Sequence, residues 1–223
     1  MKTKTTSDAG SGDCPVAENM CGRENIEWSI FYAFGMTDET NVLPRVLLVG
    51  DSICNQYQSA VRERLKGKAN ISFWASSYCV TRPEHRRILS FCLDDAKYDV
   101  VHFNNGLHSL GTPTDAYARG IAAALALIRE KQPQTKIVWS SSTPLTDAAK
   151  TAKCRELNAA AAKAAAAFGV DGTDDLFALC DPLDRKENWK DVFHFQPAAI
   201  EKQADQVATS ILSSLILPLT AHI

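Results

Sequence analysis

The stretch RVLLVGDS, residues 45–52, decides the predicted fold. Residues 46–49 form a short apolar run that ends at Gly50, which is typical of a central strand buried on both faces of a sheet. Apolar residues then recur at helical spacing: Ile53, Tyr57, Val61 and Leu65. We therefore predict a strand that passes directly into a helix, with Asp51 and Ser52 at the junction.

Four more segments continue this alternation. Strands are predicted at NISFWA (70–75), YDVVHFN (98–104) and KIVWSSS (136–142), with a short fifth strand near Val170. Strands that alternate with helices pair in parallel through right-handed crossovers. The prediction is a three-layer, doubly wound α/β domain of flavodoxin-like type, with a mainly parallel five-stranded sheet.

Two of the connecting helices have clear end signals. Thr112 as N-cap, Pro113 at the first helical position and Asp115 in a capping box predict the start of a helix. The Ala-rich segment 148–168 has high helix propensity, and Gly169 is expected to end that helix.

The composition is that of one soluble globular domain. The chain has 223 residues, of which 45% are hydrophobic and 22% charged, enough to bury a single core. Residues 1–25 lack periodicity and are predicted to be a flexible N-terminal arm, and residues 26–218 a single domain whose last helix begins at Pro197. The aromatic segment 27–35 fits either a strap packed on the domain or a cover over part of a site.

Charge and hydropathy narrow the expected partners. With 24 Lys and Arg against 26 Asp and Glu, the net charge is −2, so we expect no nucleic-acid partner. No apolar run reaches about 18 residues, so we expect no membrane span. The N-terminal residues offer no apolar stretch for a signal peptide, which favours a cytoplasmic protein, or a secreted one if a leader was removed. These patterns carry no information on the oligomeric state.

The cysteines and histidines do not form a recognisable ligand set. Seven cysteines are scattered along the chain without a Cys-x-x-Cys pair, which favours reduced thiols over a disulfide framework or a zinc site. The five histidines are dispersed as well. We expect no metal and no cofactor.

Polar residues stand where parallel strands end, and ligands of such sheets bind at that edge. Ser52 follows the first strand, and Asp191 and His194 precede the last helix. A serine hydroxyl becomes a nucleophile near pH 7 when an imidazole takes its proton and a carboxylate orients the imidazole. The alternatives are that Ser52 only caps its helix and that His194 is a surface histidine near a carboxylate.

These residues resemble the sequence blocks of the SGNH (GDSL-type) hydrolases. Val49-Gly50-Asp51-Ser52 is similar to the first block, Asn104 to the third, and Asp191-Val192-Phe193-His194 to the fifth. The resemblance extends over about residues 45–215. It implies a serine ester hydrolase that works through an acyl-enzyme.

The resemblance also implies roles for single residues. Ser52 would be the nucleophile, His194 the general base and then acid, and Asp191 its orienting partner. The backbone N–H of Ser52 and the side-chain amide of Asn104 would line the oxyanion hole. The third block, HFNN, places Asn104 at the family's oxyanion asparagine and Asn105 at the following aspartate.

The second block departs from the family pattern. Cys79 aligns with the oxyanion glycine, or Ser77 does if the register slips. Because the group needed at this position is a backbone N–H, either residue is tolerable. Cys79 as the nucleophile itself is a rival reading.

The expected substrate is a small-molecule or glycan ester, with a short acyl group such as acetyl on a carbohydrate or another polar alcohol. Asn105, His108 and Arg82 are candidate substrate-binding residues, although His108 equally fits a structural hydrogen bond. An aromatic and polar rim suited to a sugar is predicted from these residues: Trp74, Tyr78, Arg82 and His85.

Two other classes of function stay open. One is a lipid or aryl ester esterase. The other is a domain that binds a ligand without hydrolysing it, either flavodoxin-like or glycan-binding. The sequence has no glycine-rich phosphate loop of either common pattern, which speaks against a nucleotide-binding domain.

Overall fold

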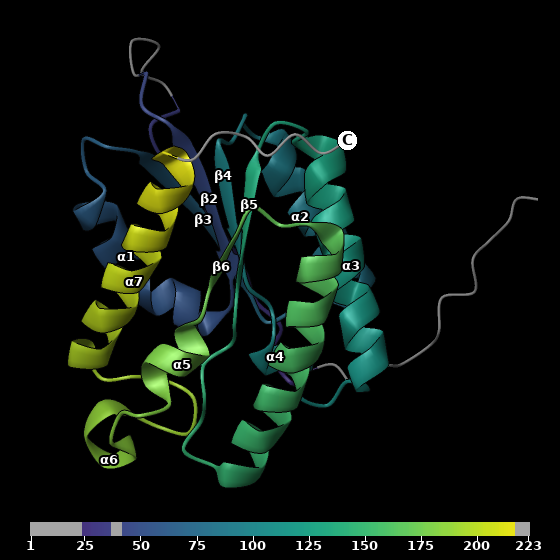
Figure 1. The fold of residues 1–223 in the computed structure, drawn as a ribbon, viewed down its shortest axis with the longest axis vertical. Coiled ribbons are helices and arrows are strands. Elements are labelled where there is room, and N and C mark those ends of the chain that lie inside the picture. The colour runs from purple at the N-terminus through teal and green to yellow at the C-terminus, as the bar shows by residue number, and fades with distance from the viewer. Residues whose placement is uncertain (1–23, 37–41, 217–223) are drawn as a thin grey trace, which may run out of the picture.

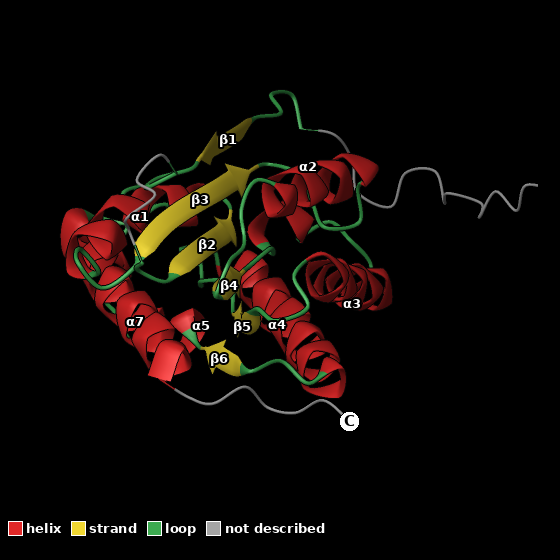
Figure 2. Ribbon diagram, turned by 90° about the horizontal axis from the view of Figure 1, so that it is seen from above, coloured by secondary structure: helices red, strands yellow, loops and turns green. Residues whose placement is uncertain are grey.

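The computed structural model describes residues 24–36 and 42–216. Its centre is a six-stranded sheet in the order β1-β3-β2-β4-β5-β6 (Figure 2). Five of the strands are parallel: β2 (Arg45–Gly50), β3 (Asn70–Ser76), β4 (Val100–Phe103), β5 (Lys136–Ser140) and β6 (Gly172–Asp174). The doubly wound α/β fold predicted from the alternation is confirmed.

The predicted number of strands was too low. An additional strand, β1 (Ser29–Tyr32), pairs antiparallel with β3 at one edge of the sheet. Within the segment 27–35, the Ser29 hydroxyl also accepts a hydrogen bond from Trp74 Nε1 at 2.9 Å. The segment therefore packs on the domain as a strap, because an edge of the sheet offers it unpaired backbone groups.

Helices cover both faces of the sheet (Figures 1 and 2). One face carries α1 (Ser52–Arg64), α5 (Leu176–Cys180) and α7 (Pro197–Ile216). The other carries α2 (Pro83–Asp94), α3 (Thr114–Lys131) and α4 (Ala148–Phe168). A short helix, α6 (Arg185–Asn188), lies in the connection that leads to α7.

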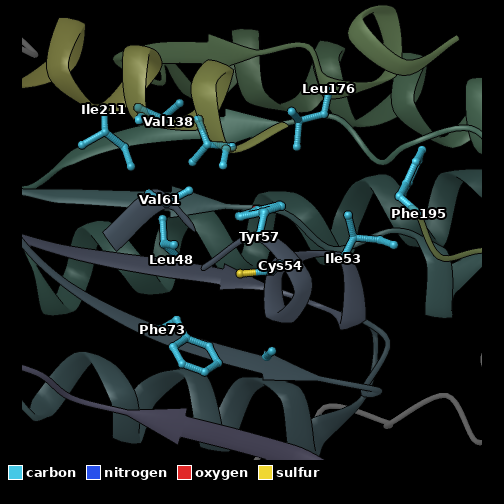
Figure 3. Packing of buried hydrophobic residues seen from close by; sticks show 14 of the residues in the cluster. Leu48, Ile53, Cys54, Tyr57, Val61, Phe73, Val138, Leu176, Phe195 and Ile211 are labelled. Carbon is cyan, nitrogen blue, oxygen red and sulfur yellow. The ribbon is translucent and has the colours of Figure 1, made fainter. Parts of the chain in front are cut away.

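Strand β2 shows why this sheet is stable between two helical layers. Val46 and Leu48 belong to the core under α1 and α7, whereas Leu47 and Val49 belong to the core under α2, α3 and α4. Successive side chains of a strand point to opposite faces, so a continuous apolar run fills both cores. Figure 3 shows the first core, in which Tyr57 of α1 lies among the aliphatic side chains.

The predicted helix ends had mixed outcomes. Gly169 follows α4 with φ of +79°, and its N–H bonds back to the carbonyls of Ala165 and Ala166, as expected of a glycine C-cap. The predicted cap at Thr112 was wrong, because α3 begins at Thr114 after an extended Pro113. The buried Thr112 hydroxyl instead lies 3.7 Å from Cys79 Sγ.

No helix within residues 24–36 and 42–216 combines the length and apolar character needed to cross a lipid bilayer.

Candidate active site

The junction between β2 and α1 positions the serine. Asp51 is the N-cap residue of α1, and its Oδ1 accepts a hydrogen bond from the N–H of Ile53 at 2.9 Å. Ser52 is the first residue of the helix, and its hydroxyl is not used as the cap. Because Asp51 caps α1, the alternative in which Ser52 serves only as the helix cap is excluded.

A histidine and an aspartate complete a triad with this serine. His194 Nε2 lies 2.9 Å from Ser52 Oγ, and His194 Nδ1 lies 2.8 Å from Asp191 Oδ2. Because an ionised carboxylate only accepts hydrogen bonds, Nδ1 donates to Asp191, and the tautomer with its proton on Nδ1 leaves Nε2 as an acceptor for the Ser52 hydroxyl. The structure thus brings together the three residues predicted as Ser-His-Asp.

The Asp191 carboxylate is held in its charged form. Partial burial acts to raise its pKa, but the backbone N–H groups of His194 and Phe193, each 2.8 Å from Oδ1, and the His194 ring outweigh it. The result is a pKa of about 2, against 3.8 for an ordinary aspartate. The two side chains keep contact with solvent, with 34% of His194 and 48% of Asp191 exposed.

Ser52 and His194 open into a cavity of about 520 Å³. Its apolar wall is formed by these residues: Trp28, Leu107, Leu110 and Phe193. Glu24 and His108 add a polar pair, in which His108 Nδ1 lies 2.5 Å from Glu24 Oε1. The Trp28 ring meets His108 edge to face, with the ring centres 6.2 Å apart.

Sequence reasoning missed most of this wall. Trp28 belongs to the segment 27–35, which therefore acts both as a strap and as a cover over part of the site. Glu24 lies at the end of the segment expected to be a flexible arm, and residues 1–23 lie outside the described residues. His108 lines the cavity and makes a structural hydrogen bond to Glu24, and its contact with substrate remains a prediction.

The second-block residues differ in what they can offer an oxyanion. The backbone N–H of Ser77 donates to the carbonyl of Trp28 at 3.1 Å, one residue beyond the pairing of β1 with β3. The Ser77 N–H therefore already has a partner. Cys79 is left as the second-block residue proposed for the oxyanion hole, and this role remains a prediction. The Cys79 sulfur is buried against Thr81 Oγ1 at 2.9 Å and does not line the Ser52 cavity, which speaks against its being the nucleophile.

The two asparagines after β4 both make structural hydrogen bonds. Asn104 Nδ2 donates to the Ser140 carbonyl at 2.8 Å and to Ser142 Oγ at 3.1 Å. Its assignment to the oxyanion hole stays a prediction. Asn105 is buried, accepts from the Val80 N–H at 3.0 Å and donates to the Tyr78 carbonyl at 2.9 Å. Its amide joins the loop after β3 to the loop after β4, and Asn105 does not line the Ser52 cavity. The expected contact of Asn105 with substrate was therefore wrong.

The predicted aromatic rim was also wrong. Arg82 pairs with Glu84 at 3.1 Å and with Glu27 at 3.8 Å, and lines a different cavity between α2 and α3. Trp74 of β3 and His85 of α2 are buried in ring contact with each other. None of the four residues predicted for the rim lines the Ser52 cavity.

Residues 24–36 and 42–216 contain no group of three or more His, Cys, Asp or Glu side chains arranged to hold a metal ion.

Comparisons with known proteins support the fold. No family model matches the sequence, and comparison with curated proteins gives no match. Among solved structures, a candidate SGNH hydrolase from Slackia heliotrinireducens is 20% identical with a TM-score of 0.60, over 76% of this chain and 99% of that one. A carbohydrate esterase family 3 protein from Talaromyces cellulolyticus is 14% identical with a TM-score of 0.63, over 78% and 98%.

An acetyl esterase, solved as a mutant with an acetate ion, is 14% identical with a TM-score of 0.59, over 78% of this chain and 98% of that one. These similarities show that the chain has the fold of the SGNH hydrolases.

The Asn105 amide should be needed for stability. Asn105→Ala leaves the buried Val80 N–H and Tyr78 carbonyl without this partner, so we expect the free energy of unfolding to fall by about 2 to 4 kcal/mol. Urea unfolding followed by circular dichroism measures this change. A variant as stable as the wild type would contradict the structural role of Asn105.

Asp191 should make stability depend on pH in the acid range. Its pKa of about 2 lies below that of the unfolded chain, so its stabilising effect is complete above about pH 4 and is lost as the pH falls towards 2. The difference in unfolding free energy between wild type and Asp191→Asn should therefore shrink as the pH falls from about 5 to about 2.5. A difference that does not change over this range would show that the carboxylate is not held in its charged form.

Proposed function

We propose that this protein is a serine ester hydrolase in which Ser52 is the nucleophile. The observation that carries the proposal is the continuous chain of short contacts from Asp191 through His194 to Ser52, at the mouth of a cavity. A surface histidine beside a carboxylate would account only for the contact of His194 with Asp191, and a helix-capping serine for neither contact. The SGNH-hydrolase fold supports the same reaction class.

The reaction would proceed in two steps. Ser52 Oγ attacks the carbonyl carbon of the ester while His194 Nε2 takes the hydroxyl proton, and then gives it to the departing alcohol oxygen. Water next attacks the carbonyl carbon of the acyl-serine while His194 takes its proton. His194 then returns this proton to Ser52 Oγ as the carbon–oxygen bond breaks and the carboxylic acid leaves. Asp191 keeps the ring oriented and stabilises the imidazolium in both steps.

The carbonyl oxygen becomes an anion in each step and needs hydrogen-bond donors. Ser52 lies at the first position of α1, where backbone N–H groups have no partner within the helix and the helix dipole is positive. Cys79 and Asn104 are the other proposed donors. For Asn104, the proposal requires one N–H of the side-chain amide to give up its hydrogen bond to Ser140 or Ser142 and to donate to the oxyanion instead.

For the substrate we propose a short acyl group, such as acetyl, on a carbohydrate or another polar alcohol. The Glu24–His108 pair offers hydrogen bonds to hydroxyl groups, and Trp28 beside it offers a flat surface for a sugar ring. The names of two similar structures, a carbohydrate esterase and an acetyl esterase, support this choice. The apolar side chains of Leu107, Leu110 and Phe193 favour an aryl ester as the second candidate.

Ester hydrolysis should depend on the Ser52 hydroxyl. We expect wild-type protein to hydrolyse 4-nitrophenyl acetate faster than the butyrate and octanoate esters, and Ser52→Ala to lose this activity. Ser213→Ala, at an exposed serine of α7, is the matched control and should keep it. Activity that persists in Ser52→Ala would reject the proposal, and faster hydrolysis of octanoate would reject the short acyl group.

Asn104 should affect turnover more than binding. Asn104→Ala removes a proposed oxyanion donor, so we expect kcat for 4-nitrophenyl acetate to fall roughly 100- to 1000-fold with little change in KM. Urea unfolding of the same variant separates this effect from a loss of structure. A folded variant with near wild-type kcat would remove Asn104 from the oxyanion hole.

A further inference from the structure

A second cavity lies between α2 and α3 and shares no lining residue with the Ser52 cavity. Its volume is about 390 Å³, and the loop from β3 to α2 forms one wall. Both helices connect parallel strands, so both run from the carboxyl edge of the sheet back to its amino edge. The cavity follows the groove between them.

The face of α2 that lines this groove is cationic at its N-terminal end and apolar further along the helix. Arg82, His85, Arg86 and Leu89 follow one another at helical spacing and all line the cavity. Cationic groups therefore stand at the N-terminal end of the helix and an apolar group stands one turn further on. The positive end of the helix dipole coincides with the cationic end.

The side of α3 that faces α2 also changes from a cationic residue to apolar residues along the groove, and most of these apolar residues are small. Arg119 lines the N-terminal part of the groove, and Ala123, Ala124 and Leu127 line the part beyond it. At Gly120 a Cβ atom would come within 2.8 Å of Val80 Cγ1, so the backbone of α3 approaches the β3–α2 loop closely there. The floor of the groove is thus apolar, and its lining contains three arginines and no acidic residue.

His85 is a buried polar group with no partner in this part of the chain. It is 1% exposed, lines the cavity and lies against Trp74 with ring centres 5.0 Å apart, but has no hydrogen bond to any described residue. Burial lowers its pKa to about 3, so the ring is neutral and offers one donor and one acceptor. Because His85 lines the cavity, a molecule bound there can exchange hydrogen bonds with this ring.

The arginines differ in how much of their charge is already neutralised. Arg82 is fixed by Glu84 and Glu27, and Arg119 pairs with Asp115 at 2.8 Å in an exposed ion pair. Within the described residues, Arg86 has no ion-pair partner. The N-terminal end of the groove therefore has a cation available for an incoming anion, and the neutral imidazole of His85 lines the same cavity.

We propose that this groove binds a small amphipathic carboxylate, with the carboxylate against Arg86 and His85 and the alkyl chain between Leu89 and Leu127. The carboxylate would accept hydrogen bonds from the guanidinium and from the imidazole N–H. The chain would cover the small residues of α3. The site is separate from the chemistry at Ser52 and does not depend on it.

Calorimetric titration of the full chain with sodium octanoate tests this site. We expect saturable binding of one octanoate, weakened at least about tenfold in Ala123→Phe, which fills the groove, and in Arg86→Glu, which reverses the free charge. Ala126→Phe on α3 and Lys163→Glu on α4 are matched controls at exposed positions outside the cavity, and should change the affinity by less than about twofold. Octyltrimethylammonium and acetate, which lack the charge or the chain, should bind at least about tenfold more weakly.

Three results would overturn the proposal. The first is the absence of saturable octanoate binding. The second is equal affinity of the wild type, Ala123→Phe and Arg86→Glu, which would place octanoate elsewhere, including the Ser52 cavity. The third is equal binding of octyltrimethylammonium, which would show that the arginines do not select the charge.

Discussion

The site depends on the way in which Asp51 ends strand β2 and begins helix α1. Its carboxylate accepts the N–H of Ile53, which satisfies a helix donor that would otherwise lack a partner. With the cap supplied by Asp51, the hydroxyl of Ser52 is available to His194. Had Ser52 been the cap, its oxygen would point back to the helix backbone. A single capping bond thus decides which oxygen faces the cavity.

Hydrogen bonds between the loops keep the rest of this edge in place. Asn105 joins the loop after β3 to the loop after β4, and Asn104 joins the latter to the loop after β5. The parallel strands bring these loops to one edge, but their backbone groups do not pair with each other as strands do. Side-chain amides make good connectors because each both donates and accepts. These bonds hold together three of the loops at the edge of the sheet where Ser52 lies.

Much of this arrangement could be predicted from the sequence. The apolar run before Gly50 and its polar continuation predicted both the central strand and the place of Ser52, because burial on two faces leaves a clear pattern. The pairing of Asp191 with His194 was predicted from their place before the last helix together with the resemblance to the SGNH hydrolases. These features are local, or are fixed by the topology of a parallel sheet.

Apart from the N-cap predicted at Thr112, the errors concern contacts between segments far apart in sequence. Strand β1 has only four residues, and its pairing with β3 is set by an open sheet edge rather than by its own pattern. Trp28 enters the site through that pairing. Arg82 was expected at the site because it follows β3, but its ion pairs and the direction of α2 place it in the other cavity. The Asn105 amide could not be assigned without knowing which loop faces it.

The most direct test of the central claim is labelling with a fluorophosphonate, a reagent that phosphonylates serines activated by a histidine. Mass spectrometry of the labelled chain after proteolysis would locate the adduct. The triad predicts one adduct, on Ser52, formed by the wild type and lost in His194→Ala. Absence of labelling in folded wild-type protein, or an adduct that forms equally well without His194, would contradict it.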